Sequence, residues 1–388
     1  MRLIIIDNET IRRGAQMFGQ HFKKHLNSSG HICKRIFLYS PEDETPLLLM
    51  DENDWLLQGR KKHVHEFFPS IQVWICRLIA KYLHEFEPDI ILLNGARSVK
   101  YGGIVKRYFY KGNAPFVVRV IGSVVYWNRS IIQQLYSRYV ITPKIDGAIG
   151  VGEKALNDYR SLYHFKGPGV FIPRSFDFNS FTNSRNREQI RSDLKIKSTH
   201  KIVLYLGSLN TEKRPDRFLR VFHAATKQIP EARAWVVGDG KLRSQMEKHA
   251  YKLGILEKVT FWGYQTNVES FIIGSDVLLI TSDSEGVPGI AMESLYLERP
   301  VVTTNAGDVA IVVQHRKSGF ISEIEDEKGL ISNLILLLSN PRLARTFGIN
   351  GRKYITQNFD LSRITDQYLK FFNHIIKVKN EGKLIETK

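Results

Sequence analysis

The sequence predicts an α/β protein of two domains, each built on a parallel β-sheet with helices on both faces. Short apolar runs of strand length alternate with longer segments whose apolar residues recur at helical spacing, which is typical of parallel sheets. The alternation is interrupted in the polar, aperiodic stretch 175–187, which follows Pro173. A length of 388 residues also exceeds what one ordinary hydrophobic core accommodates.

The first half is expected to contain buried strands separated by helices. Continuous apolar runs favour strands covered on both faces, and apolar residues at helical spacing favour amphipathic helices. The expected strands are 3–6, 90–93, 116–121 and 148–151, and the expected helices are 14–27, 71–85 and 130–139.

The second half repeats this organisation. Its expected strands are 202–206, 234–237, 258–261, 277–280 and 301–303, and its expected helices are 214–228, 242–253, 289–297 and 327–338.

These patterns place the domains at 1–175 and 188–360. The last expected helix, 361–379, carries apolar residues able to pack, and we expect it to cross back onto the first domain. Two α/β halves joined by a short linker are predicted to face each other across a cleft, which is then the expected binding site.

Composition indicates a cytoplasmic protein. The two cysteines, Cys33 and Cys76, are too few for a disulfide framework and fit a reducing compartment. The apolar run 3–6 is far shorter than a signal-peptide core, and no apolar stretch approaches the roughly 18–20 residues that span a bilayer. The inner face of the membrane is kept as a candidate peripheral location.

The net charge of +17 indicates an anionic partner, which is a phosphorylated substrate, an acidic membrane surface or nucleic acid. Between residues 90 and 145 the basic residues are interleaved with aromatic ones, and there is no Asp or Glu. This stretch fits an anionic membrane surface, and it equally fits a solvated face with aromatic side chains in the core. Because no nucleic-acid-binding module is visible, no nucleic-acid partner is expected. The basic residues are Arg97, Lys100, Lys106, Arg107, Lys111, Arg119, Arg129, Arg138 and Lys144, and the aromatic ones include Tyr101, Tyr108, Phe109, Tyr110 and Trp127.

The segment 282–293, Ser-Asp-Ser-Glu-Gly-Val-Pro-Gly-Ile-Ala-Met-Glu, has the pattern of a ligand-binding loop followed by a helix. Gly286 and Gly289 permit close approach of the backbone to a ligand, and Pro288 suits a first helical turn. The N–H groups at such a helix N-terminus bind phosphate without a metal. Glu285 and Glu293 are placed to address different parts of one extended ligand. The alternative is a surface carboxylate before an ordinary helix.

A second candidate phosphate-binding loop, 207–215, follows the expected strand 202–206. Its adjacent cations, Lys213 and Arg214, stand at a helix start and are suited to neutralising a diphosphate, although such a pair is also common on solvated surfaces. The later turn around Gly238 lacks the third glycine of a dinucleotide-binding fingerprint, since Arg243 occupies that position.

Taken together, seven short motifs in order make the second half resemble glycosyltransferase family 4, whose members are retaining enzymes of the GT-B fold. The first half resembles this family more loosely, at Arg13-Gly-Ala15, Gly30-His31, Pro88-Asp-Ile-Ile91 and Ile172-Pro173…Asp177. The motifs of the second half are Gly207…Glu212-Lys213, Val237-Gly-Asp-Gly240, Val259-Thr-Phe-Trp-Gly263, Ser275-Asp-Val277, Ser284-Glu-Gly-Val-Pro288…Glu293, Pro300-Val-Val302 and Ser318-Gly-Phe320.

The resemblance implies a role for each matching residue. Glu285 would contact the donor sugar near the reacting centre, and Glu293 would hydrogen-bond ribose hydroxyls. Lys213 would pair with the diphosphate and stabilise the leaving nucleotide. The remaining substrate-binding residues that it implies are Gly14, Arg214, Gly238, Tyr264, Gly286, Val287 and Gly289, of which Tyr264 lies where the nucleobase is usually cradled.

Two positions depart from the family pattern. Ser208 stands where an arginine usually follows the first glycine of the second domain, and Arg214 is the candidate replacement for that cation. Ile121 stands where a histidine often lies near the reacting sugar, which leaves the first-domain residue at the reacting centre unassigned.

The resemblance implies a retaining hexosyltransferase that uses a UDP- or GDP-linked sugar and no metal. Its acceptor would be a glycan or a lipid-linked glycan in cell-surface polysaccharide or lipopolysaccharide biosynthesis. A sugar-nucleotide epimerase of the same architecture and a donor-binding protein without turnover remain as alternatives.

Overall fold

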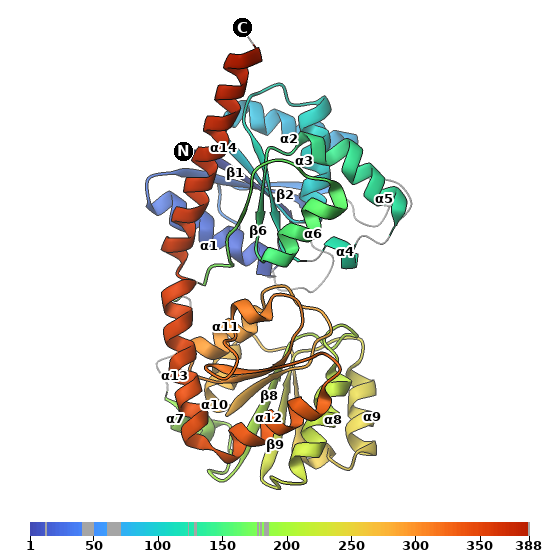
Figure 1. Ribbon diagram of the computed structural model, residues 1–388, viewed down its shortest axis with the longest axis vertical. Helices are drawn as coiled ribbons and strands as arrows, with labels where there is room; N and C mark the ends of the chain where they lie inside the picture. Colours follow the sequence, from blue (N-terminus) through green and yellow to red (C-terminus); the bar gives the residue numbers. More distant parts are fainter. Residues whose placement is uncertain are drawn as a thin grey trace. The chain divides into compact units, whose positions relative to one another are not determined.

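The computed structural model describes residues 1–11, 14–40, 50–59, 71–122, 124–127, 130–176, 178, 181 and 186–386. Its backbone divides into two compact units, one comprising Met1–Ser175 with Leu361–Lys388 and the other Phe176–Asp360 (Figure 1). Arg13, Arg129, Asp177 and the side chain of Trp127, which the sequence predictions name, lie outside the described residues.

The first unit is built on a parallel sheet with the strand order β3-β2-β1-β4-β5-β6-β7. β1 lies inside the sheet, and its neighbours are the second and the fourth strand along the chain. The strands are β1 (Arg2–Glu9), β2 (Ile32–Tyr39), β3 (Trp55–Gly59), β4 (Ile90–Asn94), β5 (Phe116–Val120), β6 (Gly147–Gly150) and β7 (Gly169–Phe171).

Helices cover this sheet, and apolar side chains fill the layers on both of its faces. α14 packs against α1, which joins the end of the chain to the first unit. The helices are α1 (Gly14–Ser28), α2 (Val73–Phe86), α3 (Ala96–Tyr108), α4 (Val124–Trp127), α5 (Ile131–Tyr136), the π-helix η1 (Ser137–Ile141), the 3-10 helix η2 (Thr142–Lys144), α6 (Glu153–Tyr163) and α14 (Leu361–Glu386).

The second unit has the same strand succession, in the order β10-β9-β8-β11-β12-β13, and all its pairings are parallel. Its strands are β8 (Lys201–Leu206), β9 (Ala232–Val237), β10 (Val259–Gly263), β11 (Val277–Ile280), β12 (Val301–Thr304) and β13 (Gly319–Ser322). Its helices are α7 (Arg187–Asp193), α8 (Pro215–Thr226), α9 (Arg243–Lys252), α10 (Val268–Gly274), α11 (Gly289–Tyr296), α12 (Glu327–Ser339) and α13 (Pro341–Asn358), with short 3-10 turns η4 (Leu256–Lys258) and η5 (Val309–Ile311).

The structure confirms the predicted fold of two parallel-sheet α/β domains. The sequence analysis did not predict β2, β3, β7 and β13. It expected strands only where apolar residues form a long, uninterrupted run, and these four strands lack such a run. Lys34 and Arg35 interrupt β2, and Arg35 is nevertheless buried because it pairs with Asp7. The pattern also missed α3, α4, α6, α7, α10 and α13. α3 contains Gly102 within its length. A side chain at this position would overlap the side chain of Leu93, so the helix can lie this close to Leu93 only with glycine there.

A buried polar network joins the carboxyl ends of the central strands of the first unit. The Arg35 guanidinium donates to the Asp7 carboxylate at 2.7 and 2.9 Å, and the Asn94 amide donates to the other Asp7 oxygen at 2.7 Å. Arg119 donates to Asn94 Oδ1 and to the hydroxyl of Tyr368, both at 3.0 Å. Burial raises the pKa of Asp7, and the arginines and Asn94 oppose that rise. Tyr368 thus ties α14 to the end of β5.

This network bears on the two interpretations of the basic stretch 90–145, which were a surface for an anionic membrane and a solvated face with aromatic side chains in the core. Arg119 is buried, and the rings of Tyr101 and Tyr110 lie in the core. Lys106 forms an ion pair with Asp146. Part of the stretch therefore belongs to the interior, as the alternative interpretation proposed for the aromatic residues.

Both cysteines are buried free thiols, and burial raises the pKa of Cys76 to about 12. Within the described part of the chain, every helix is too short or too polar to cross a lipid bilayer.

We expect Tyr368→Phe to destabilise the first unit by about 2 kcal/mol, because the buried Arg119 Nε loses its hydroxyl acceptor. Urea denaturation of the purified protein measures this loss. Tyr251→Phe, which changes an exposed tyrosine of the second unit, is the matched control and should leave the midpoint unchanged. Equal midpoints for the two variants would show that Tyr368 does not fasten α14.

Candidate functional site

The candidate site of the second unit lies where the order of its strands reverses. β8 is the first strand of this sheet and lies between β9 and β11, so the connection leaving β8 and the connection leaving β11 run to opposite sides. In open parallel sheets, ligands bind at the carboxyl ends of two such strands. Lys213 lies in the loop after β8, and Glu285 lies in the loop after β11.

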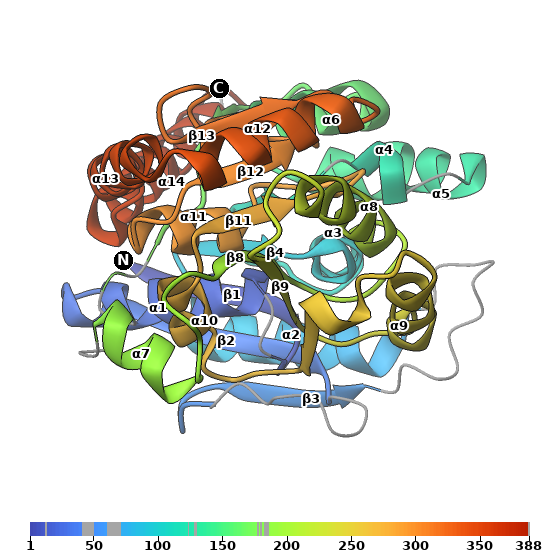
Figure 2. The ribbon, with the colours of Figure 1, turned by 90° about the horizontal axis from the view of Figure 1, so that it is seen from below.

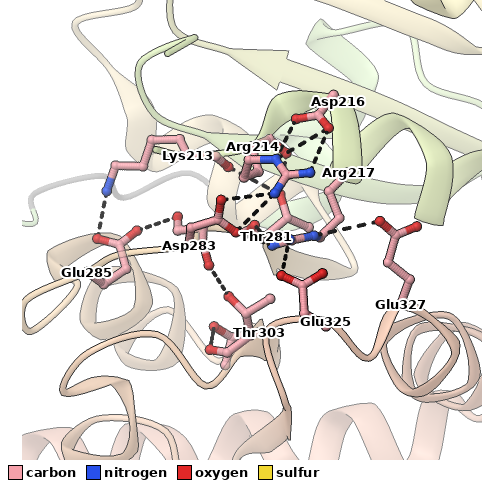
Figure 3. A network of polar contacts seen from close by, with 12 residues as sticks. Lys213, Arg214, Asp216, Arg217, Thr281, Asp283, Glu285, Thr303, Glu325 and Glu327 are labelled. Atoms are coloured by element: carbon pink, nitrogen blue, oxygen red, sulfur yellow. Dashed lines mark hydrogen bonds and ion pairs between the residues drawn. The ribbon is translucent and has the colours of Figure 1, made fainter. Parts of the chain in front are cut away.

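These two residues form an ion pair. Lys213 Nζ lies 2.6 Å from Glu285 Oε2 (Figure 3). The hydroxyl of Ser282 donates to Glu285 Oε1 at 2.7 Å. The Glu285 side chain is only 7% exposed, whereas that of Lys213 is 29% exposed. The carboxylate is therefore held at both oxygens, and the ammonium group remains open to solvent and to a ligand.

A helix N-terminus lies a few residues beyond this ion pair. α11 begins at Gly289 after Pro288, and no side chain caps its first turn. The N–H groups of Gly289 and Ile290, at the start of that turn, have no carbonyl partners within the helix, so together with Lys213 they make a suitable site for an anion.

Two arginines of the same loop and helix hold the segment after β11 in place (Figure 3). Arg214 donates to Asp283 at 2.9 Å and to Asp216 at 3.0 Å. Arg217, which is almost fully buried, donates to Asp283 at 2.8 Å and to the carbonyl oxygen of Thr281 at 2.9 Å. Asp283 therefore accepts from both arginines, which fixes the β11 loop against α8.

Further polar contacts strengthen this connection. The hydroxyl of Thr281 donates to the carbonyl oxygen of Arg214 at 2.9 Å, and the backbone N–H of Asp283 donates to the carbonyl oxygen of Glu212 at 2.9 Å. Burial acts to raise the pKa of Asp216, but hydrogen bonds from Arg214 and Arg220 hold it below its ordinary value. Asp216 consequently stays ionised and paired at neutral pH.

Gly307 supports the Glu285 loop from the β12 side. Its φ is +64°, and a Cβ atom there would lie 1.8 Å from the carbonyl oxygen of Glu285. A non-glycine side chain would displace the backbone that carries Glu285. Gly238 permits a similar close approach after β9, since a Cβ atom there would lie 2.0 Å from the carbonyl oxygen of Gly207.

The structure brings Lys213 and Glu285 into contact and places the other second-unit residues that the sequence singled out on neighbouring loops and on α11. Gly286 and Val287 adjoin Glu285 in the β11 loop, and Gly289 and Glu293 lie in α11. Tyr264 is an exposed residue that follows Gly263, whose φ of +68° turns the chain at the end of β10.

For two of the predicted residues, Gly14 and Arg214, the structure does not show a position ready to bind the ligand. Gly14 starts α1 in the first unit, so its approach to a ligand of the second unit stays a prediction. Arg214 was the candidate replacement for the cation absent at Ser208. Its guanidinium is bonded to Asp216 and Asp283 in this structure, so a ligand would have to compete with two carboxylates for it.

Sequence reasoning missed Arg217, Ser282 and Gly307. Ser282 lies in the predicted ligand-binding loop 282–293. Its hydroxyl is three residues before Glu285, and this spacing could have suggested the hydrogen bond between them. Arg217 resembles any helical surface arginine in the sequence, and Gly307 lies outside the quoted motifs. Only the folded chain places these two beside the β11 loop.

The family model that matches this chain covers only residues of the second unit. Residues 186–354 match the family model described as glycosyl transferases group 1. Among curated proteins, the chain is similar to an N-acetyl-alpha-D-glucosaminyl L-malate synthase of Bacillus anthracis, with 24% identity over 60% of this chain and 58% of the relative. It is also similar to the lipopolysaccharide core biosynthesis glycosyltransferase LpsD of Rhizobium meliloti, with 27% identity over 50% of this chain and 56% of the relative. The chain thus spans little more than half the length of these two relatives.

A solved structure, Anabaena Alr3699/HepE in complex with UDP, matches with a TM-score of 0.78 over 96% of this chain and all of that one, at 16% identity. This likeness concerns the fold and confirms the predicted GT-B architecture.

We expect Gly307→Ala to destabilise the second unit by about 3 kcal/mol or more, because the new Cβ overlaps the Glu285 carbonyl. Gly254→Ala is the matched control: its φ of +67° is nearly the same, but the space around it is open, so about 1–2 kcal/mol of backbone strain is expected there. Thermal unfolding measures both. If the two variants lose equal stability, the close approach at Glu285 contributes nothing.

Proposed function

We propose that the chain is a retaining glycosyltransferase, because its residues 186–354 match the family model described as glycosyl transferases group 1. It transfers a hexosyl group from a nucleoside-diphosphate sugar to a glycan or a lipid-linked glycan. The observation that carries this proposal is the Lys213–Glu285 pair beside the α11 N-terminus, at the point where the strand order reverses.

The chemistry of this group of residues suits the departure of a nucleotide. Breaking the bond between the anomeric carbon and the diphosphate oxygen leaves negative charge on that oxygen. The partly exposed ammonium of Lys213 and the uncapped N–H groups of α11 are fixed positive ends for that charge, and they stabilise the transition state more than the ground state.

Glu285 has a second task in the proposed reaction. When the diphosphate takes Lys213 as its partner, the Glu285 carboxylate keeps the hydrogen bond from Ser282 and becomes available to hydroxyls of the donor sugar. The acceptor hydroxyl bonds to the anomeric carbon on the face that the diphosphate leaves, and its proton passes to the departing phosphate oxygen. This course retains the anomeric configuration.

The named relatives support the choice of substrate class. One is a glycosyltransferase of lipopolysaccharide core biosynthesis, and a solved structure of the same fold contains UDP. We therefore propose a UDP- or GDP-linked hexose as donor, a cell-surface polysaccharide or lipopolysaccharide precursor as acceptor, and a cytoplasmic reaction. We propose that no metal is required, because Lys213 and α11 supply positive ends to the diphosphate.

The first unit would supply the acceptor side. Ile121 directly follows β5 and cannot carry a proton, so the proposed reaction relies on Glu285 and Lys213 and assigns no catalytic group to that position. A sugar-nucleotide epimerase or a donor-binding protein without turnover would use the same second unit. Transfer of labelled sugar to an added glycan fraction distinguishes the proposed function from both.

We expect Glu285→Gln to lower the rate of sugar transfer by about 100-fold or more, because the amide retains the size of the side chain but loses the charge that faces the donor and Lys213. The rate is measured as release of the nucleoside diphosphate in the presence of acceptor. Glu231→Gln, at an exposed position before β9, is the control and should keep the full rate. A wild-type rate in Glu285→Gln would remove this residue from the mechanism.

We expect one nucleotide class to raise the melting temperature of the protein when UDP-, GDP- and ADP-sugars are compared without added metal. A donor at a hundredfold excess over its dissociation constant stabilises the folded state by about 2.7 kcal/mol. Lys213→Ala should weaken this shift, because it removes the exposed cation of the site. A shift that is unchanged in Lys213→Ala would place the nucleotide elsewhere.

A further inference from the structure

The first unit has a strand reversal of its own, between β1 and β4. The connection that leaves β1 runs toward β2, and the connection that leaves β4 runs toward β5. The carboxyl ends of these two strands are therefore a place where a ligand can bind, and we call them the β1–β4 edge. α3 begins after β4 and packs against both strands, and both views show it beside this sheet (Figures 1 and 2). Asn8 at the end of β1 and Arg97 and Lys100 in the first turns of α3 bring hydrogen-bond donors to this edge.

Arg97 and Lys100 are neighbouring cations without a counter-charge. They are three residues apart in α3 and so lie on the same side of the helix. A long helical side chain leans toward the N-terminus of its helix, which brings Lys100 toward Arg97. Burial lowers the pKa of Lys100, and the charge of Arg97 lowers it further. Neither cation forms an ion pair with a residue that the structure describes, and the sequence has no Asp or Glu between 90 and 145.

A pair of buried tyrosines holds Arg97 in place. The guanidinium carbon lies 5.2 Å from the ring centre of Tyr39, at the end of β2. The Tyr39 hydroxyl donates to the Tyr101 hydroxyl at 3.2 Å, and Tyr101 also accepts from the backbone N–H of Gln72 at 3.1 Å. Because stacking on a ring uses none of the guanidinium N–H groups, Arg97 is fixed in position and keeps its donors for a ligand.

Asn8 adds a neutral donor beside these cations. Its side-chain oxygen accepts from the backbone N–H of Ser98 at 3.1 Å, which fixes the amide against the start of α3. A Cβ atom at Gly95 would lie 2.9 Å from Asn8 Nδ2, so the glycine leaves room for this amide. Nδ2 donates to no residue that the structure describes. The β1–β4 edge thus presents two positive charges and an amide donor.

We propose that Arg97, Lys100 and Asn8 bind a phosphate group of the acceptor, carried either by a phosphorylated saccharide or by a lipid-linked diphosphate. Phosphate oxygens accept from guanidinium, ammonium and amide groups, and their negative charge removes the repulsion between the two cations. The assignment to the acceptor rests on the proposed function, in which Lys213 and α11 of the second unit hold the diphosphate of the donor.

Titration of the full-length protein with inorganic pyrophosphate, followed by calorimetry, tests the proposal. The background for every measurement is Lys213→Ala, because this substitution removes the cation that the donor diphosphate is proposed to contact. The test variant adds Arg97→Gln with Lys100→Gln. The matched control adds Arg107→Gln, which removes an exposed cation from the last turn of the same helix. A further variant adds Lys100→Arg, which keeps the charge, and unchanged melting temperatures show that the variants are folded.

We expect the background protein to bind pyrophosphate and the test variant to bind it at least about tenfold more weakly, because a charge-assisted hydrogen bond contributes roughly this factor or more. Arg107→Gln and Lys100→Arg should bind as the background does. Absence of binding, or an equal loss in Arg107→Gln, would overturn the proposal. UDP or GDP that binds more tightly than pyrophosphate, and is lost in the test variant, would assign the cations to the donor and would overturn it as well.

Geranyl diphosphate, a soluble prenyl diphosphate, distinguishes the two sources of phosphate. Tighter binding than that of pyrophosphate indicates a lipid-linked acceptor, and equal binding indicates a phosphorylated saccharide. These titrations require no sugar transfer, so the phosphate site and the proposed function can fail separately.

Discussion

Two loops that leave a parallel sheet in opposite directions must be held together if they are to form one site. In the second unit these are the loops after β8 and β11, and paired charges hold them. Arg214 and Arg217 bind Asp283 from the β8 side, the Thr281 hydroxyl returns a hydrogen bond, and the Lys213–Glu285 pair closes the contact at its solvent end. The position of the candidate catalytic carboxylate depends on this junction.

The cations of this junction have two different roles: some hold the loops in place, and one is available to a ligand. Arg217 is buried and is bonded to Asp283 and to a carbonyl oxygen, so its charge fixes the loop. The ammonium of Lys213 is the more exposed member of its pair, and it can exchange a carboxylate for a phosphate. Breaking a buried pair is costly, whereas exchanging partners at a part-exposed cation costs little.

In the first unit, a buried polar network holds the central strands and α14 together. Asp7, Asn94 and Arg119 lie toward the carboxyl ends of β1, β4 and β5, Arg35 bonds to Asp7 from the middle of β2, and Tyr368 of α14 bonds to Arg119. Residues far apart in the sequence thereby fix the end of β5, which Ile121 follows.

The sequence by itself determined the two parallel sheets and the loop that contains Glu285, because both are encoded locally: buried strands are apolar runs, and a ligand-binding turn requires glycines at fixed spacing. It could not determine that β2 continues through Lys34 and Arg35, that Arg217 and Gly307 support the loop, or that the apolar residues of α5 face solvent while Arg119 is buried. These outcomes depend on partners distant in the sequence. A charged side chain is buried only where the fold supplies its counter-charge, and an apolar one is left exposed only where packing offers it no neighbour.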